Sequence, residues 1–262
     1  MNNMKTKDMN GNGIRINKYI SETGFCSRRE ADRLIFEGRV SINDKTAEVG
    51  SKVHQNDIIK INGQPLANIK KNIYIAFNKP VGIVSTTDQK EKHNIIDYIG
   101  FPERIFPIGR LDKDSEGLIL LTNDGDIVNK ILRSGNNHEK EYIVTVDKPV
   151  TKDFIAAMSN GVRILGTVTK KCQVEAISKN TFRIILTEGM NRQIRRMSEV
   201  FGYSVTKLKR VRIMTIRLGG LPIGSWRYLT DSELKEIHRL VAHSTKTEEG
   251  SISKIRRKHK NI

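Results

Sequence analysis

The sequence predicts an α+β protein with a small N-terminal domain and a larger second domain. Its 262 residues are more than one small domain needs and suit two. Segments with the period of a helix and segments with the alternation of a strand both occur along the chain. Because no strand–helix–strand repeat is visible, we expect a mixed, mainly antiparallel sheet flanked by helices.

The charge of the chain points to a polyanionic partner. Lysine and arginine number 46 against 29 aspartate and glutamate residues, so the formal net charge is +17. Nucleic acid is the first candidate for such a partner, and an anionic membrane surface is the second. The sequence has no long apolar stretch and no hydrophobic signal core near its start, so we expect a soluble, cytoplasmic protein without a membrane partner.

Cysteine and histidine usage predicts neither a disulfide framework nor a metal site. Cys26 and Cys172 form no CxxC motif, so we expect free thiols in a reducing compartment. The six histidines lack metal-ligand spacing, and the chain has no glycine-rich nucleotide-binding motif. We therefore expect no metal and no cofactor.

Composition shifts divide the chain into five parts. Residues 1–13 are polar and rich in Asn and Gly, and we expect them to be disordered. Residues 14–63 form the predicted small domain, and residues 64–72 a linker. The second domain is predicted over residues 73–242, and residues 243–262 form a flexible basic tail.

The small domain is predicted to contain two short helices and a small sheet. Ile16 and Ile20 lie one turn apart in the first helix, which Gly24 ends. Ser27 and Glu30 have the spacing of a capping box at the start of the second helix. The inner face and the end of this helix are predicted at Ala31, Leu34, Ile35 and Gly38. The stretches RVSIND and DIIKING read as strands.

Five basic residues lie on or beside the two predicted helices. A solvated helix face is the plain interpretation of one such helix, but two adjacent basic helices in a chain of this charge favour RNA phosphates as ligands. The candidate RNA-binding residues of this domain are Arg15, Lys18, Arg28, Arg29 and Arg33.

The second domain shows longer strands and fewer helices. The stretches IYIAFNKPVGIVST, EKEYIVTVDKP and NTFRIILTEG have strand-like patterns, as does the run LILL. The stretches DGDIVNKIL, TKDFIAAM, NRQIRRMSEVFG and TDSELKEIHRL have helical spacing. This order predicts sheet and helices mixed within one domain.

The stretch GRLDKDSEG places Asp112 just before a buried strand. It imitates the start of a calcium-binding EF-hand loop, but the twelfth position, which needs a glutamate, is Asn123. A simple turn is the other plain interpretation. A carboxylate at the edge of a buried sheet needs a cation to stay ionised, and residues 187–217 hold eight Lys and Arg against two Glu. We therefore predict an arginine-held carboxylate in a nucleic-acid cleft.

Both domains resemble known families. SRREADRLI and the INDK turn resemble the S4 RNA-binding domain over residues 14–63. NKPVG, GRLDKDSEGLILLTNDG, EKEYIV and EGMNRQIRRM resemble, in order, the motifs of pseudouridine synthases of the RsuA/RluB/RluE/RluF type. The stretches KPVGIVSTT and LPIGSWRYLTDSEL look closest to an enzyme of that family that modifies large-subunit rRNA. The resemblance implies an S4-like domain followed by a pseudouridine-synthase catalytic domain.

The resemblance also implies the reaction and its residues. The family detaches a uracil from its ribose and rejoins it through C5, without cofactor or metal. Asp112 matches its catalytic aspartate, Tyr142 its active-site tyrosine, and Arg195 the arginine that pairs with the aspartate. The expected RNA contacts of this domain are Arg110, Lys79, Arg192 and Arg196. The expected partner is a 23S rRNA stem-loop or a ribosome assembly precursor, bound by a monomer.

Several alternatives remain open from the sequence. Tyr142 shares a strand face with Val144 and Val146, so it also fits a core position. Lys79 fits a structural role as well as a phosphate contact. A non-catalytic S4-type RNA-binding or ribosome assembly factor is the main alternative function. A glycosidase-like hydrolase, with Asp114 or Glu116 as a second carboxylate, fits the basic surface less well.

Overall fold

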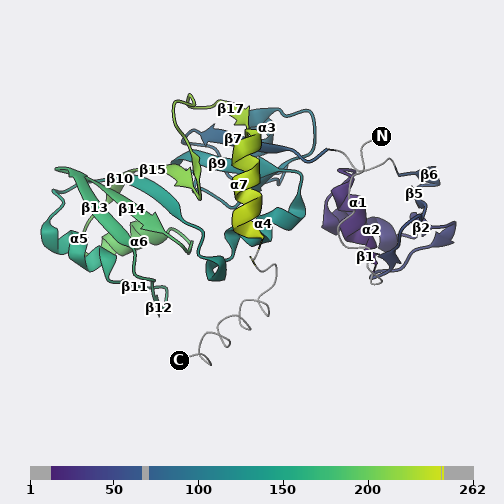
Figure 1. The fold of residues 1–262 in the computed structure, drawn as a ribbon, viewed down its shortest axis with the longest axis horizontal. Coiled ribbons are helices and arrows are strands. Elements are labelled where there is room, and N and C mark those ends of the chain that lie inside the picture. Colours follow the sequence, from purple (N-terminus) through teal and green to yellow (C-terminus); the bar gives the residue numbers. More distant parts are fainter. Residues whose placement is uncertain (1–12, 67–70, 243, 245–262) are drawn as a thin grey trace. The chain divides into compact units, whose positions relative to one another are not determined.

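A computed structural model describes residues 13–66, 71–242 and 244. Most of the predicted disordered segment, residues 1–13, and of the predicted tail, residues 243–262, therefore lies outside the described residues. The chain divides into two compact units, Met1–Asn72 with Pro102–Arg104, and Ile73–Phe101 with Ile105–Ile262 (Figure 1). Each unit has its own hydrophobic core.

The N-terminal unit packs two helices on small sheets. Helices α1 (Ile16–Glu22) and α2 (Arg28–Phe36) pack against each other. Four of the described strands follow the order β3-β2-β5-β6, and two more pair as β1-β4. Their bounds are β1 (Ile14–Arg15), β2 (Val40–Ile42), β3 (Lys45–Thr46), β4 (Lys52–Val53), β5 (Ile59–Ile61) and β6 (Gln64–Pro65).

The local sequence accounts for the ends of these elements. Gly24 and Gly38 follow the two helix ends with φ of 82° and 69°, a left-handed conformation that glycine adopts without strain. The predicted capping box is only half formed: the Ser27 hydroxyl accepts from the Glu30 amide, whereas the Glu30 carboxylate pairs with Arg33 instead. β6, at residues expected in the linker, adds a strand beside β5.

The second unit is built on a large mixed sheet. Among the described residues, nine strands form this sheet, and β9 and β15 run parallel while the other pairs are antiparallel. Across the sheet the order is β13 (Gln173–Ser178), β14 (Thr181–Leu186), β10 (Lys140–Val146), β15 (Val205–Ile213), β9 (Glu116–Thr122), β7 (Tyr74–Lys79) and β17 (Trp226–Tyr228). β16 (Ile216–Arg217) pairs with β15, and β8 (Phe106–Ile108) pairs with β9.

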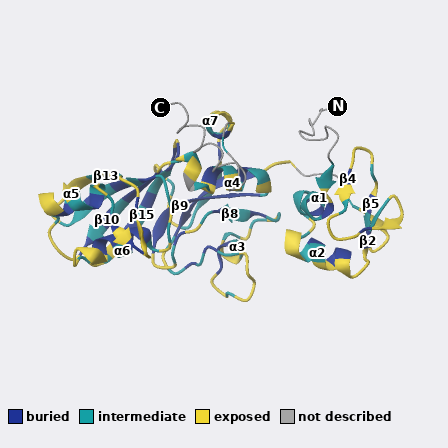
Figure 2. Cartoon of the chain, turned by 90° about the horizontal axis from the view of Figure 1, so that it is seen from below, coloured by how far each residue is buried: buried dark blue, intermediate teal, exposed yellow. Residues whose placement is uncertain are grey.

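Helices cover both faces of the sheet. Figure 2 shows that its central strands are largely buried. One face packs on α4 (Gly125–Leu132) and α7 (Asp231–Val241). The opposite face packs on α3 (Ile95–Ile99), α5 (Lys152–Ser159) and α6 (Gln193–Val200). Because side chains alternate along a strand, residues of β7 and β9 divide between these two cores.

The expected α+β class is confirmed, and each helix and strand stretch named for the second unit contains an element of the expected type, although β7 covers only Tyr74–Lys79 of IYIAFNKPVGIVST. In this unit the sequence patterns missed helix α3 and strands β8, β13, β15, β16 and β17. They also missed the hairpin of β11 (Arg163–Ile164) with β12 (Thr167–Val168) and a 3₁₀ turn at Ser134–Asn136. Most of the missed elements are too short to show a period, so neighbouring strands and helices decide their conformation.

Candidate active site

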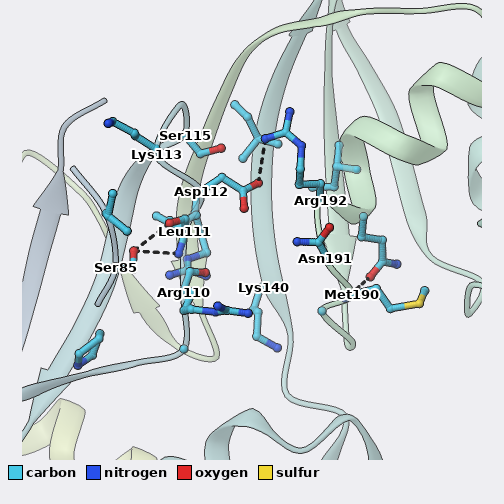
Figure 3. Close-up of a pocket in the computed structure, with 18 of the residues that line it drawn as sticks. Ser85, Arg110, Leu111, Asp112, Lys113, Ser115, Lys140, Met190, Asn191 and Arg192 are labelled. Carbon is cyan, nitrogen blue, oxygen red and sulfur yellow. Dashed lines mark hydrogen bonds and ion pairs between the residues drawn. The ribbon is translucent and has the colours of Figure 1, made fainter. Parts of the chain in front are cut away.

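The candidate site is a cavity of about 1130 Å³ on the α5–α6 side of the second unit. Most of its walls come from four places in the chain: residues 84–88, the loop 109–115 between β8 and β9, strands β10 and β15, and the segment 188–195 at the start of α6. Figure 3 shows side chains from these segments directed toward one space. The GRLD and NRQIRRM motifs, about 80 residues apart in sequence, therefore meet here.

Hydrogen bonds hold the Asp112 loop in place on both sides. The Ser85 hydroxyl donates to the Leu111 carbonyl at 2.8 Å and accepts from the Leu111 amide at 3.1 Å (Figure 3). The Gly82 amide donates to the Lys113 carbonyl at 2.8 Å, and the Ser115 amide donates to the Asp112 carbonyl. The Asp112 side chain, which is about one-third exposed, therefore projects from a fixed backbone into the cavity.

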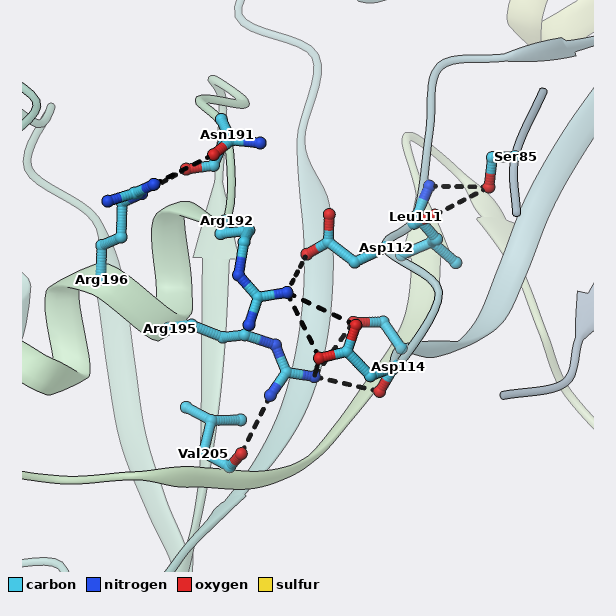
Figure 4. A network of polar contacts seen from close by, with 10 residues as sticks. Ser85, Leu111, Asp112, Asp114, Asn191, Arg192, Arg195, Arg196 and Val205 are labelled. Carbon is cyan, nitrogen blue, oxygen red and sulfur yellow. Dashed lines mark hydrogen bonds and ion pairs between the residues drawn. The ribbon is translucent and has the colours of Figure 1, made fainter. Parts of the chain in front are cut away.

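The cation beside Asp112 is Arg192. Its Nη1 lies 3.9 Å from Oδ2 of Asp112 and 3.3 Å from Oδ2 of Asp114 (Figure 4). The expected pairing of Arg195 with Asp112 is wrong, because the carboxylate partner of Arg195 is Asp114, at 3.6 Å. Arg195 lies within buried α6 and its guanidinium reaches only the base of the loop. Arg192 precedes the helix, is partly exposed and reaches the tip.

Arg195 ties the loop to the sheet. Its Nη1 donates to the Val205 carbonyl at 2.9 Å, and its Nη2 donates to the Asp114 carbonyl at 3.0 Å and to the Ser115 hydroxyl at 3.3 Å. Arg192 has a φ of 50°, which is strained for a residue other than glycine and is typical of functional sites. Burial opposes ionisation of Asp114, but its own backbone amide, Arg195 and Arg192 together lower its pKa.

Tyr142 lies in the wall of the cavity on β10. It shares the buried face of the strand with Val144 and Val146, as the alternation predicts, and its side chain is 9% exposed. It belongs to the hydrophobic core and also lines the cavity. Its hydroxyl makes no hydrogen bond to any residue that the structure describes. The geometry therefore accommodates both a packing role and a contact with a bound base.

Lys79 does not reach the cavity. Its side chain is fully buried, and Nζ donates to the carbonyls of Pro80 at 2.8 Å and Ile83 at 2.7 Å. Burial lowers the pKa of Lys79 to about 8, while Asp112 and Asp114 act in the opposite direction. These contacts fit the structural alternative for Lys79 rather than the phosphate contact, because the ammonium holds the turn of the NKPVG motif.

The other two basic residues expected near the site differ in their surroundings. Arg110 is exposed and lines the cavity, as its place two residues before Asp112 suggests. Arg196 lies behind the site, where Nε donates to the Asn191 carbonyl at 3.1 Å and Nη2 to the Asn191 side chain at 3.2 Å (Figure 4). Arg196 thus holds the segment before α6.

In the N-terminal unit the five candidate cations fall into two groups. Arg15 lies on β1 rather than on the first helix, and it is exposed, as are Arg28 and Arg29 at the start of α2. Lys18 pairs with Glu22 at 3.4 Å, and Arg33 pairs with Glu30 and, at 3.9 Å, with Glu37. The second group is therefore partly neutralised within its own helices.

Two residues that line the cavity were not predicted from the sequence motifs. Lys140 and Arg210 both line the cavity and are 8% and 3% exposed. Lys140 stands two residues before Tyr142, so strand alternation alone places it on the same face. Arg210 belongs to LKRVRI, where charged residues alternate with apolar ones so closely that no hydrophobic pattern indicates strand β15.

The comparisons with known proteins agree with this arrangement. Residues 73–199 match the RNA pseudouridylate synthase family and residues 14–59 match the S4 domain. The dual-specificity RNA pseudouridine synthase RluF of Escherichia coli (strain K12) is 58% identical over 234 residues, which are 88% of this chain and 81% of that protein. The ribosomal large subunit pseudouridine synthase B of Bacillus subtilis is 38% identical over 87% of this chain and 97% of that protein.

A crystal structure of a pseudouridylate synthase superimposes with a TM-score of 0.63 at 30% identity, over 86% of this chain and all of that one. An S4 domain joined to this sheet and its carboxylate-bearing cavity defines an enzyme that modifies RNA. The chain belongs to the RNA pseudouridine synthase family, whose members are isomerases. None of the helices in the described ranges is long and apolar enough to span a membrane.

Proposed function

We propose that the protein converts a specific uridine of large-subunit (23S) ribosomal RNA into pseudouridine, with Asp112 as the catalytic carboxylate. The observation that carries this proposal is the Asp112 carboxylate on a fixed loop, beside Arg192, at a cavity large enough for a nucleotide. The name of the Bacillus subtilis relative supports the large ribosomal subunit as the target.

The reaction breaks the bond between N1 of uracil and C1′ of ribose and forms a bond between C5 and C1′. The proton on C5 leaves and N1 gains one, so no electrons and no atoms other than protons are exchanged. A carboxylate can assist by attacking the sugar, by attacking the ring, or by removing a ribose proton. Each of these roles uses the Asp112 carboxylate, whose Oδ2 lies 3.9 Å from Nη1 of Arg192.

The target uridine must leave the RNA stack to reach Asp112, at a cost of a few kcal/mol. Tyr142 supplies an aromatic ring in the cavity wall on which the flipped base can stack, which would return about 1–3 kcal/mol. Its hydroxyl, which has no hydrogen-bond partner in the described part of the chain, is available for proton handling near C5. Arg110, exposed at the rim, is placed to contact the RNA backbone or fill the vacated position.

The remaining roles follow from the contacts. Arg195 and Arg196 position the loop and the start of α6, and Arg192 holds the carboxylates. Arg15, Arg28 and Arg29 are the exposed cations of the S4 unit that we assign to RNA phosphates. We expect a monomer that acts in the cytoplasm, where ribosomal RNA is made and assembled.

Mapping of pseudouridines in total RNA tests the proposal. A strain that lacks the protein should lose pseudouridine at one or a few positions of 23S rRNA, and a plasmid copy should restore them. Because the Escherichia coli relative is named dual-specificity, the map should include all stable RNA classes. An unchanged map with defective ribosome assembly would instead support the alternative, a non-catalytic S4-type factor.

A further inference from the structure

Two buried cations face the candidate site from neighbouring strands. Arg210 of β15 is the direct antiparallel partner of Tyr142 on β10, and directly opposed residues project from the same face of a sheet. Lys140 stands two positions before Tyr142 on that face. Both cations line the cavity, so they flank Tyr142, the proposed base-stacking residue.

Neither cation has an acidic partner among the described residues. Lys140 Nζ has one weak contact, to the His138 carbonyl at 3.4 Å. Arg210 donates through Nε to the Leu118 carbonyl at 2.6 Å and through Nη1 to the Arg110 carbonyl at 3.4 Å. Its Nη2 is buried and has no hydrogen-bond partner within the described ranges.

On the opposite face of the same two strands, an arginine is paired with glutamates. Arg212 follows Arg210 by two positions, and a register irregularity beside Tyr142 turns it to the other side of the sheet. There Nε donates to the Glu141 carboxylate at 2.7 Å and Nη2 to the Glu139 carboxylate at 3.0 Å. Carboxylates therefore compensate Arg212 on one face, whereas no carboxylate in the described part of the chain pairs with Lys140 or Arg210 on the cavity face.

A buried arginine without a counter-ion is costly, because it cannot lose its proton. Lys140 can, and burial together with Arg210 and Lys170 lowers its pKa to about 8, so at neutral pH it still carries most of its charge. These two charges lie together on one wall of the cavity, and no carboxylate among the described residues pairs with either of them. An anion from outside the chain is the group that would compensate them.

We propose that Lys140 and Arg210 form a subsite for one backbone phosphate of the RNA, next to the flipped uridine. Lys140 contacts a phosphate oxygen directly, and the buried Arg210 adds a second charge behind it. The subsite deepens the proposed function and rests on it, because RNA supplies the anion. Since Arg210 also holds the Arg110 carbonyl, the same side chain links phosphate binding to the loop that carries Asp112.

Coupling between Lys140 and a single phosphate tests the subsite. The RNA is the stem-loop around the mapped uridine, made with natural linkages or with one neutral methylphosphonate on the 5′ or the 3′ side of the target. Lys140→Met should weaken binding of the natural RNA about tenfold, the scale of a charge-assisted hydrogen bond. At one of the two linkages the methylphosphonate should weaken wild-type binding similarly and have no further effect on Lys140→Met.

Two control variants sharpen this test. Lys179→Met removes an exposed lysine between β13 and β14, outside the cavity, and its loss of affinity should be independent of the linkage. Lys140→Arg keeps the charge and should keep the coupling. Additive effects of Lys140→Met and both methylphosphonates would overturn the subsite. Failure of the wild type to form pseudouridine in the natural RNA would overturn the proposed function instead, while binding would still be measurable.

Discussion

At the scale of single residues, the site separates two aspartates that look alike in sequence. Asp112 and Asp114 stand two positions apart in one loop and both contact Arg192. Asp114 also pairs with Arg195, at 3.6 Å, and the Arg195 side chain is buried. Both carboxylates line the cavity, but Asp112 has only the longer contact to Arg192, so it is the one less engaged by arginine.

Asp112→Asn keeps the shape of the side chain and removes its charge. We expect turnover to fall below detection while RNA affinity stays within about twofold of wild type, because the carboxylate repels rather than binds phosphate. Single-turnover conversion of the RNA stem-loop measures this. Asp114→Asn is the matched control and should retain much more activity. Conversion by Asp112→Asn at more than a few per cent of the wild-type rate would contradict the assignment.

Tyr142→Phe separates the packing role of Tyr142 from its proposed chemical role. The hydroxyl makes no hydrogen bond within the described chain, so its removal should leave the melting temperature unchanged. We expect RNA binding to persist, because the ring still stacks on the base, and most of the turnover to be lost. Parallel measurement of melting, RNA affinity and single-turnover rate decides between the roles. A wild-type single-turnover rate for Tyr142→Phe would show that Tyr142 has only a packing role.

At the scale of elements, β15 joins the functional parts of the sheet. It pairs antiparallel with β10 and parallel with β9, so it lies between Tyr142 and the strand that follows the Asp112 loop. The parallel pairing brings Gly117 against Arg210, where Gly117 has a φ of 107°. A β-carbon at Gly117 would lie 2.8 Å from the Arg210 nitrogen and closer still to its carbonyl.

Gly117→Ala should therefore destabilise the protein, by about 2–4 kcal/mol, because both the backbone conformation and the strand approach exclude a methyl group. Gly220→Ala is the control: its β-carbon would meet nothing within 4 Å, and the stability should change by less than about 0.5 kcal/mol. Denaturant unfolding of the three proteins measures the difference. Equal stability of Gly117→Ala and wild type would disprove the close approach.

The buried Lys140 predicts a stability that depends on pH. Burial lowers its pKa from 10.5 to about 8, so the folded protein opposes its charge. Below pH 8 the lysine is charged in both the folded and the unfolded protein, and burying its charge lowers the folding stability by at most about 3 kcal/mol. This loss of stability decreases as the pH rises from 8 to 10.5. Lys140→Met should thus be more stable than wild type at pH 7, with the advantage shrinking by pH 10 in thermal unfolding.

Lys140→Gln offers a check on that interpretation, because it removes the charge without adding an apolar side chain. It should show the same trend with a smaller gain in stability at pH 7. A stability difference between wild type and Lys140→Met that is constant from pH 7 to pH 10 would mean that the ammonium is not desolvated. The stability and binding measurements together show whether Lys140 increases RNA affinity while it lowers the stability of the fold.

At the scale of the whole molecule, we propose that the S4 unit adds RNA contacts to those of the second unit, which carries the chemistry. The S4 unit presents exposed arginines at the start of α2, and the second unit holds the cavity. Because phosphate contacts release counterions, each one adds to the slope of log K against log salt concentration, by about 0.7 for single-stranded RNA. The salt dependence of binding therefore reports how many cations of the S4 unit contact RNA.

The double variant Arg28→Ala/Arg29→Ala should weaken RNA binding and reduce that slope by about 1–2. The single-turnover rate at saturating RNA should stay unchanged, since both residues lie in the other unit. Arg33→Ala provides the comparison, because Arg33 is already paired with Glu30 and Glu37 and should contribute less. An unchanged slope for the double variant would show that the start of α2 does not contact phosphate.

The sequence by itself determined the fold class, the family and the type of most long elements. Local signals carry this information: Ser27 caps α2, Gly24 and Gly38 end the two helices, and Tyr142, Val144 and Val146 share one face of β10. Each depends on residues a few positions apart, so it can be recognised without knowing the rest of the molecule. The motifs around Asp112 and Arg195 identified the family in the same way.

Only the tertiary structure decided which charges meet. The pairing of Arg195 with Asp114, the approach of Arg192 to Asp112 and the burial of Lys79 depend on how a loop, a helix and a turn pack. Arg210 and Arg212 have the same local sequence character, yet Arg212 faces two glutamates, and Arg210 faces the cavity without a carboxylate partner among the described residues. Electrostatic partners are set by distances of a few ångströms between distant segments, which local periodicity does not encode.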